Sequence, residues 1–214
     1  MKIQPFETHT QRYEDWFDRN RFAYESELEA VKAMLPRKGY GVEIGVGSGR
    51  FAAPLGIEHG IEPSPKMGAI AEKRGVIILG GTAENLFSTD ETFDYALMVT
   101  TLCFLEDVDA AFKEAHRILT PKGYFINGFV DRKSEIGRSY EKHKQESPFY
   151  REATFYSVDE VVEHLQRAGF GDMEFNQTIF HPLGEIEAIE PIKPGYGEGS
   201  FVVIKAKKIG GKIK

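Results

Sequence analysis

The chain has 214 residues, 41% of them hydrophobic and 28% charged, which is typical of a soluble globular protein with one sizeable core. Its formal net charge of −6 argues against a nucleic acid partner, because phosphate binding requires clustered Lys and Arg. A single cysteine, Cys103, excludes an internal disulfide and a thiolate metal site, so we expect no metal ion.

No targeting or membrane segment is recognisable. The first ten residues lack the apolar stretch of a signal peptide, and no apolar run approaches the ~20 residues of a membrane span. We therefore expect a cytoplasmic protein that has no membrane partner.

Residues 12–35 are predicted to be helical, either as one helix or as two that meet near Asn20. Apolar side chains recur there at spacings of three and four, and Pro36 and Gly39 end the pattern. Tyr13 and Trp16 lie on the apolar side. They either dock the helix on the core or cover a ligand.

The segment that follows is the most informative part of the chain. A short apolar run, residues 41–44, contains Glu43 and leads into Gly45, Gly47 and Gly49. This pattern predicts a buried strand that turns sharply into a helix N-terminus. Glycines suit such a turn, because it needs backbone angles closed to other residues and lets a ligand approach the main chain. The helix N-terminus would offer N–H groups to an anionic group.

A second acid follows at a meaningful distance. Glu62 ends the next predicted strand, 17 residues after Gly45, where an acid can bind the two ribose hydroxyls of a nucleoside. Ser64 and Pro65 then open a helix as its N-cap and first residue. A third strand over 76–79 leads into residues 80–87.

The rest of the chain continues to alternate. We predict strands at 93–99, 124–130, 172–180 and 200–205, and helices at 108–119 and 161–168. Residues 157–160 carry the signature of a capping box, with Ser157 and Glu160 as its two members, just before the second of these helices. Polar residues 131–151 interrupt this order as a loop or mobile helix at the carboxyl edge of the sheet. The last two strands follow each other without a helix, which implies an antiparallel hairpin. The predicted fold is α/β: a doubly wound, mostly parallel seven-stranded sheet with helices on both faces.

In order and spacing, these features resemble the class I S-adenosylmethionine-dependent methyltransferases, in particular the branch that acts on small molecules. The resemblance rests on Val42–Arg50, Ile61–Glu62, Gly81–Phe87, Phe93–Asp107 and Arg117–Tyr124. It implies S-adenosylmethionine as cofactor and one methyltransferase-like domain over residues 1–214. Residues of about 9–35 would form a helical lid, and residues of about 131–151 a cap.

The resemblance also assigns residues to the methionine and ribose parts of the cofactor. Gly45, Val46 and Gly47, in the turn that Gly49 completes, would pass under the methionine part. Glu43 would attract the ammonium group, and Glu62 would bind the ribose hydroxyls.

Four further residues are assigned to the adenine and the sulfur. Pro63 would lie against the adenine face, and the N–H of Ala83 would meet a ring nitrogen. Thr82 stands where many relatives have an aspartate for the adenine amino group, so Glu84 or a main-chain carbonyl could replace that contact. Met98, at the end of the fourth strand, would line the sulfur.

The implied reaction is an in-line displacement at the methyl carbon, for which a dedicated base is optional. No catalytic base is evident, although His143, Tyr140, Tyr150 and His181 stand in segments expected to edge the pocket. Val99 replaces the start of the Asn-Pro-Pro-Tyr/Phe signature of adenine and glutamine methylation.

The leading hypothesis is an enzyme that methylates a small molecule. The alternatives are a protein that binds S-adenosylmethionine or S-adenosylhomocysteine without transfer, and a nicotinamide-dependent oxidoreductase. The latter would prefer Gly-x-Gly-x-x-Gly without an acid before it. The acceptor and the oligomeric state stay open.

Overall fold

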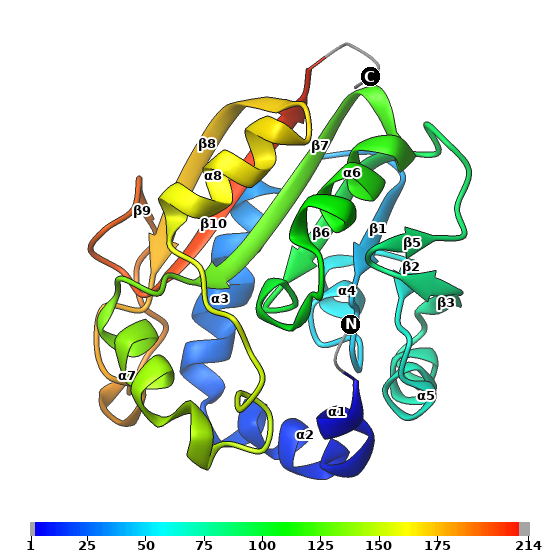
Figure 1. Ribbon diagram of the computed structural model, residues 1–214. Helices are drawn as coiled ribbons and strands as arrows, with labels where there is room; N and C mark the ends of the chain where they lie inside the picture. The colour runs from blue at the N-terminus through cyan, green and yellow to red at the C-terminus, as the bar shows by residue number, and fades with distance from the viewer. Residues whose placement is uncertain (1–2, 210–214) are drawn as a thin grey trace.

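A central eight-stranded sheet organises the computed structural model, which describes residues 3–209. The strand order is β3-β2-β1-β6-β7-β10-β8-β9, and neighbouring strands from β3 to β7 are parallel. β10 is antiparallel to both β7 and β8 (Figure 1). The strands are β1 (Gly41–Ile44), β2 (His59–Ile61), β3 (Ile77–Leu79), β6 (Phe93–Val99), β7 (Leu119–Val130), β8 (Phe170–Thr178), β9 (Lys193–Pro194) and β10 (Phe201–Lys208).

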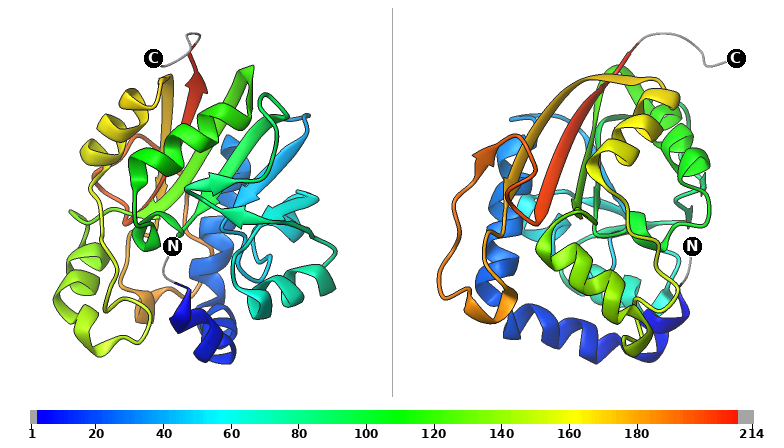
Figure 2. Two further views of the ribbon diagram at one scale, coloured as in Figure 1. Left: turned by 45° about the vertical axis from the view of Figure 1, so that its right-hand side comes forward. Right: turned by 60° about the vertical axis from the view of Figure 1, so that its left-hand side comes forward.

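Helices cover both faces of this sheet, so the molecule has three layers (Figure 2). The α-helices are α1 (Gln4–Thr8), α2 (Thr10–Arg19), α3 (Arg21–Met34), α4 (Ala52–Leu55), α5 (Pro65–Lys73), α6 (Val108–Ile118), α7 (Glu135–His143) and α8 (Val158–Arg167). Side chains of β6 alternate between the layers. Ala96 and Met98 join the core with α6 and α8, and Leu97 and Val99 join the core with α2, α3 and α4.

The α/β fold and the antiparallel carboxyl-terminal pair of strands are confirmed, but the sheet has one more strand than predicted. The extra strand, β9, pairs with β8 through only two residues, including Pro194. Such a short, proline-containing edge strand has no alternating apolar pattern, which is why the sequence did not indicate it.

Two other differences are local. β7 begins at Leu119, earlier than the predicted residue 124, and its pairing with β6 is irregular between the pairs Phe93–Leu119 and Tyr95–Tyr124. Residues 80–87 form a small separate hairpin of β4 (Gly81–Thr82) and β5 (Asn85–Leu86). Its two-residue strands are too short to show periodicity.

The amino-terminal helices gather at the carboxyl ends of the parallel strands. The predicted break at Asn20 separates α2 from α3, and both the backbone N–H and the side-chain amide of Asn20 donate to Trp16 O. α3 then runs along the sheet and buries Ala23, Ala30 and Val31. α1, α2 and α7 lie together at that edge (Figures 1 and 2).

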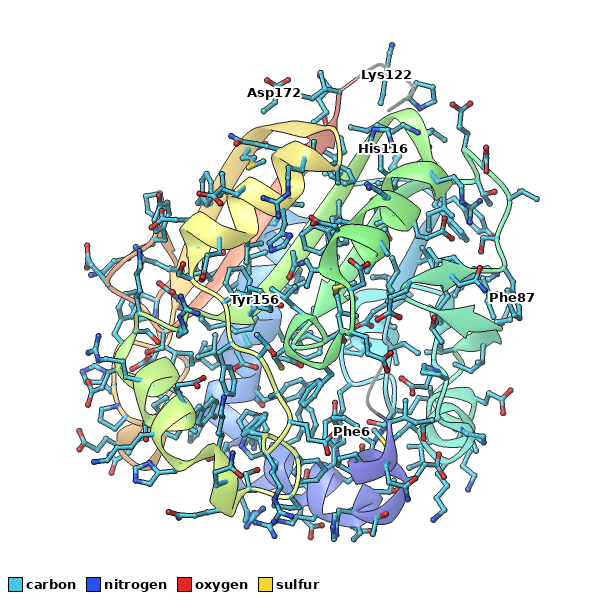
Figure 3. The ribbon with its side chains drawn as sticks, in the orientation of Figure 1. Phe6, Phe87, His116, Lys122, Tyr156 and Asp172 are labelled. Carbon is cyan, nitrogen blue, oxygen red and sulfur yellow. The ribbon has the colours of Figure 1, made fainter. Side chains whose placement is uncertain are left out.

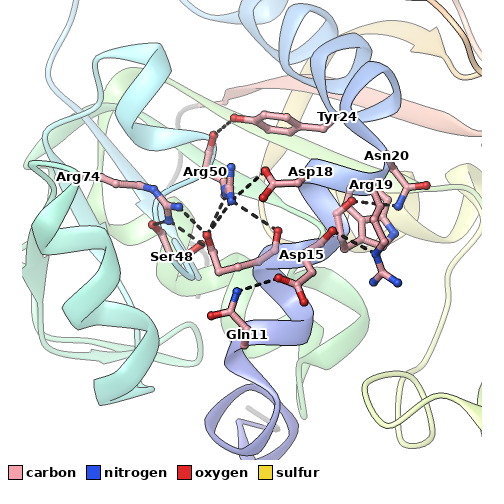
Figure 4. Close-up of polar contacts among 11 residues, drawn as sticks. Gln11, Asp15, Asp18, Arg19, Asn20, Tyr24, Ser48, Arg50 and Arg74 are labelled. Atoms are coloured by element: carbon pink, nitrogen blue, oxygen red, sulfur yellow. Dashed lines mark hydrogen bonds and ion pairs between the residues drawn. The ribbon is translucent and has the colours of Figure 1, made fainter.

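An ionic cluster fixes α2 to the turn after β1 (Figure 4). One carboxylate oxygen of Glu14 accepts from Arg50 Nη2 at 2.8 Å and from Arg74 Nη2 at 2.5 Å. Burial opposes the charged form of Glu14, but the hydrogen bonds from Arg74 and Ser48 outweigh burial and lower its pKa. Arg74 also donates to Ser48 O at 2.6 Å.

We predict that Glu14→Ala lowers the free energy of unfolding by about 1–3 kcal/mol, because two largely buried guanidinium groups lose their partner. Urea denaturation would measure the loss. Asp18→Ala is the matched control: Asp18 is 78% exposed and lies 3.7 Å from Arg50, so its loss should cost less than about 0.5 kcal/mol. Equal losses for the two variants would contradict the role of Glu14.

Candidate active site

The turn between β1 and α4 has three glycines in the left-handed region, at Gly45, Gly47 and Gly49, with φ of 72°, 54° and 80°. A Cβ on Gly45 would lie 2.4 Å from Thr101 Cγ2, so the close packing of these two segments excludes a side chain there. The N–H groups of Gly45 and Val46 both donate to Ile61 O, at 2.8 and 3.0 Å. These bonds fix the turn to the end of β2.

Glu62, the residue after β2, contacts the same turn. Its carboxylate accepts from the N–H of Gly47 at 2.9 Å and from the N–H of Ser64 at 2.8 Å. Burial raises the pKa of Glu62, and these two hydrogen bonds offset part of that effect. Each carboxylate oxygen keeps a lone pair for another donor. Pro63 follows and is half-buried.

Glu43 in β1 is a buried acid with an incomplete set of partners. Its side chain is only 1% exposed, and burial raises the pKa of its carboxyl well above the ordinary value. The N–H of Ala52 hydrogen-bonds to this carboxyl, but Oε2 accepts no hydrogen bond from the part of the chain that the structure describes. Such an oxygen costs free energy unless a ligand supplies a donor.

The adenine candidates lie in and beside the β4–β5 hairpin. Thr82 is half-buried, while Ala83 packs its side chain into the core. Glu84 Oε1 accepts from the N–H of Glu106 at 3.0 Å, which ties the hairpin to the segment after β6.

Met98 lies elsewhere. Its side chain is 0% exposed and belongs to the core beneath α6, where the side-chain amide of Asn127 donates to its sulfur at 3.8 Å. Its assignment to the cofactor sulfur stays a prediction.

A cavity of about 270 Å³ opens at the carboxyl edge of the sheet and is walled mainly by aromatic rings. The rings come from the amino-terminal helices, from the segments after β1, β6 and β7, and from residues 147–156. They are Phe6, Tyr13, Trp16, Phe17, Phe51, Phe104, Phe129, Tyr140, Phe149, Tyr150, Phe155 and Tyr156.

Phe6 joins several of these walls. Its ring makes edge contacts with Phe104 at 4.9 Å and with Tyr13 at 5.6 Å, and it lies 5.4 Å from Phe149. Figure 3 shows Phe6 at one end of the sheet and His116 near the other. Three segments far apart in sequence therefore close one aromatic space at the carboxyl edge.

Tyr13 lies where this cavity meets the glycine turn. Its ring lines the cavity, and its hydroxyl is 3.3 Å from the point that a Cβ on Gly47 would occupy. Burial and the nearby charges of Glu43, Glu14 and Glu62 raise the pKa of Tyr13, so the hydroxyl stays neutral and can donate or accept hydrogen bonds. The cavity and the predicted cofactor residues are thus neighbours.

The residues predicted to edge the pocket separate into two groups. Tyr140 and Tyr150 line the cavity, whereas the two histidines do not. His143 Nδ1 lies 3.0 Å from Ser139 O within α7, and His181 pairs with Glu190. Cys103 and Phe104 also contribute to the cavity wall.

Glu27 is a cavity residue that the sequence pattern did not single out. It lies on the buried face of α3 with Ala23, Ala30 and Val31, and it is 5% exposed. Burial alone raises the pKa of its carboxyl to about 8. The sequence does contain a signal for this residue. Glu27 lies four residues after Ala23 and three before Ala30, on the same apolar face of the helix.

We predict that Glu27→Gln changes the pH dependence of stability. The folded pKa of about 8 exceeds the ordinary value of 4.5, so the stability of the wild type falls as pH rises through this interval. At pH 8.5 the Gln variant should exceed the wild type in unfolding free energy by roughly 2–5 kcal/mol, and at pH 5 the two should be nearly equal. Urea denaturation at both pH values measures this. Glu29→Gln, on the exposed face, should show no such dependence, and the same gap at both pH values would contradict the prediction.

Comparison with known proteins identifies the family of this chain. A family model described as a methyltransferase domain matches residues 42–127. An uncharacterized protein of Methanocaldococcus jannaschii is 45% identical over 95% of this chain and 98% of that protein. A crystal structure from Thermotoga maritima, described as an S-adenosylmethionine-dependent methyltransferase and possible histamine N-methyltransferase, is 55% identical over 96% of this chain and 99% of its own, with a TM-score of 0.95.

A more distant relative is the ubiquinone biosynthesis O-methyltransferase of Azorhizobium caulinodans, 25% identical over 72% of this chain and 67% of that protein. The family model covers the glycine turn together with β1, β2 and β6. The matches argue against a nicotinamide-dependent oxidoreductase, because the matched family uses S-adenosylmethionine as its cofactor. The chain therefore belongs to the S-adenosylmethionine-dependent methyltransferases.

Proposed function

We propose that this methyltransferase acts on a small molecule that binds in the aromatic cavity. The observation that carries the proposal is the position of Tyr13, which lines the cavity while its hydroxyl approaches Gly47. A cavity of about 270 Å³ with mainly apolar walls suits a compact organic acceptor. The net charge of −6 also disfavours an RNA or DNA acceptor.

The residues of the turn have the chemistry that the cofactor requires. Gly45, Val46 and Gly47 would offer backbone beneath the methionine part. Glu43 would direct its partnerless oxygen toward the ammonium group, which supplies the donor that this buried acid lacks. Glu62 would use its remaining lone pairs for the ribose hydroxyls while its bonds to Gly47 and Ser64 hold it in place.

The adenine part would lie beyond Glu62. Pro63 would contact one face of the ring, and the N–H of Ala83 a ring nitrogen. Thr82 stands at the position for the amino group, with Glu84 beside it in the same hairpin.

The cofactor supplies an electrophilic methyl group on a sulfonium, and the protein supplies placement. Fixed walls bring an acceptor into line with that methyl, and a closed aromatic cavity excludes water. Such a wall is formed by Phe6 and Tyr13 from the amino-terminal helices and by Phe149 from the segment after α7. No histidine lines the cavity, which fits a reaction driven by placement more than by a dedicated base.

The experiment is transfer of label from methyl-labelled S-adenosylmethionine to a cell extract separated by ultrafiltration. We expect label in new small products resolved from the cofactor by chromatography, and none on retained protein or RNA. Histamine belongs among the pure acceptors, because the Thermotoga relative carries that description. Label on macromolecules only, or on nothing, would contradict the proposal.

Gly47→Val provides the matched negative control. A Val side chain would enter the space between the turn and Tyr13, and φ of 54° is strained for a branched residue. We expect a folded protein by circular dichroism that neither binds S-adenosylhomocysteine by calorimetry nor transfers label. Full transfer by this variant would show that the label does not pass through this site.

The amino-terminal helices and the segment after β7 would act as a lid over donor and acceptor. Trp16 packs edge-on against Phe17 at 5.2 Å and lines the cavity from α2. Tyr140 and Tyr150 line it from the other segment. Aromatic faces attract a sulfonium by about 0.5–2 kcal/mol per contact.

Because Trp16 is the single tryptophan, its fluorescence reports on this lid directly. We expect saturating S-adenosylhomocysteine to shift or quench the emission and to slow hydrogen exchange in residues 12–35 and 131–151. An unchanged emission together with unchanged exchange in residues 12–35 would mean that α2 and α3 are only a structural brace.

A further inference from the structure

Glu27 occupies a position where a helix normally buries an apolar side chain. It is 5% exposed and lines the cavity from α3, yet no described residue forms a hydrogen bond or ion pair with its carboxyl. A buried carboxylate without a partner is unfavourable by several kcal/mol in ordinary cores. Because Glu27 lines the cavity, a ligand bound there can reach its carboxyl.

Among the described residues, no cation forms an ion pair with Glu27 in the cavity. Tyr140 in α7 and Tyr150 in the following segment line the same cavity as Glu27. Burial raises the pKa of both phenols, and the charge of Glu27 adds a smaller effect. Arg12 and Arg19 of α2 also contribute to the cavity wall, but both are exposed and Arg19 donates to Asp15 O. Neither arginine forms an ion pair with Glu27.

Aromatic rings form much of the cavity that this carboxylate lines. Tyr140 and Tyr150 lie 5.0 Å apart, and Phe155 lies 5.4 Å from Tyr150 and 5.9 Å from Tyr140. Phe104 stacks on Tyr150 from the other side at 6.1 Å. Ring faces and one buried carboxylate are the combination that recognises an organic ammonium group, because both attract a cation that has left water.

We propose that Glu27 is the anionic partner of a cationic nitrogen in the methyl acceptor, so that the enzyme selects amines over neutral molecules of the same shape. This inference rests on the proposed function and names the acceptor class. It concerns the group that is held, whichever atom of the acceptor receives the methyl. Glu27 is thus a specificity residue, and Tyr140, Tyr150 and Phe155 form the rest of the ammonium site.

The test compares amines with alcohols of matched shape: 2-phenylethylamine with 2-phenylethanol, tryptamine with tryptophol, and hexylamine with hexanol. Calorimetry on the full chain saturated with S-adenosylhomocysteine, at pH 8.5, keeps Glu27 largely ionised and the amines protonated. We expect at least one amine to bind ten-fold or more tightly than its alcohol. Equal binding within all three pairs would overturn the proposal.

The variants assign the preference to the residue. Glu27→Gln should reduce any amine preference to less than three-fold, and Glu27→Met, which offers a second uncharged side chain of similar size, should do the same. Glu29→Gln is the control, because Glu29 lies on the exposed face of the same helix and pairs with Lys32. A preference that survives both Glu27 variants in folded protein would also overturn the proposal.

A second measurement separates acceptor from donor. If Glu27 served the sulfonium, Glu27→Gln would lower the affinity for S-adenosylmethionine relative to the affinity for S-adenosylhomocysteine, whose sulfur carries no charge. We expect that affinity ratio to stay within two-fold of the wild type, and a ten-fold change would assign Glu27 to the donor. S-adenosylhomocysteine cannot donate a methyl group, so these results do not depend on turnover. A failure of label transfer would overturn the proposed function, whereas the absence of an amine preference in the wild-type protein would overturn only the role of Glu27.

Discussion

The backbone turn after β1 is the constraint on which the site depends. Two N–H groups, of Gly45 and Val46, share the carbonyl of Ile61, and the N–H of Gly47 is held by Glu62. Both neighbours belong to the end of β2, so β1 and β2 must end at the same level for the turn to form. The parallel pairing of these strands therefore determines where the glycines open toward a ligand. Thr101, which donates to Gly45 O at 3.1 Å, adds the end of β6 to the same constraint.

The amino-terminal helices convert this open turn into an enclosed one. Glu14 fixes α2 to Arg50 and Arg74, and this brings Tyr13, one residue earlier, over Gly47. α1 is fixed separately, because Glu7 accepts hydrogen bonds from Ser64 and from the N–H of Lys66 at the start of α5. The aromatic cavity thus depends on polar contacts at its margin.

Two buried acids lower the stability of the folded chain. Glu43 and Glu27 both have raised pKa values because of burial, and each would be replaced by an apolar residue in a sequence chosen for stability alone. Glu43 belongs to β1, just before the glycine turn, whereas Glu27 belongs to α3 and lines the aromatic cavity. Such costs are expected at functional sites, where a ligand completes the missing interactions.

The sequence by itself determined the α/β fold, the glycine turn, Glu62 at the end of β2 and the capping box of Ser157 and Glu160, because each depends on local periodicity or on short-range hydrogen bonds. It did not determine β9, the irregular pairing of β7 with β6 or the burial of Met98 on the α6 side, since these follow from pairing between distant segments.

The aromatic cavity also needed the tertiary structure. Phe6, Phe104 and Tyr150 are separated by many residues and meet only when α1, the end of β6 and the segment after α7 converge at one edge of the sheet. For the same reason the sequence shows Glu27 as an ordinary helical acid, and only the folded chain encloses its carboxyl among aromatic rings and away from water.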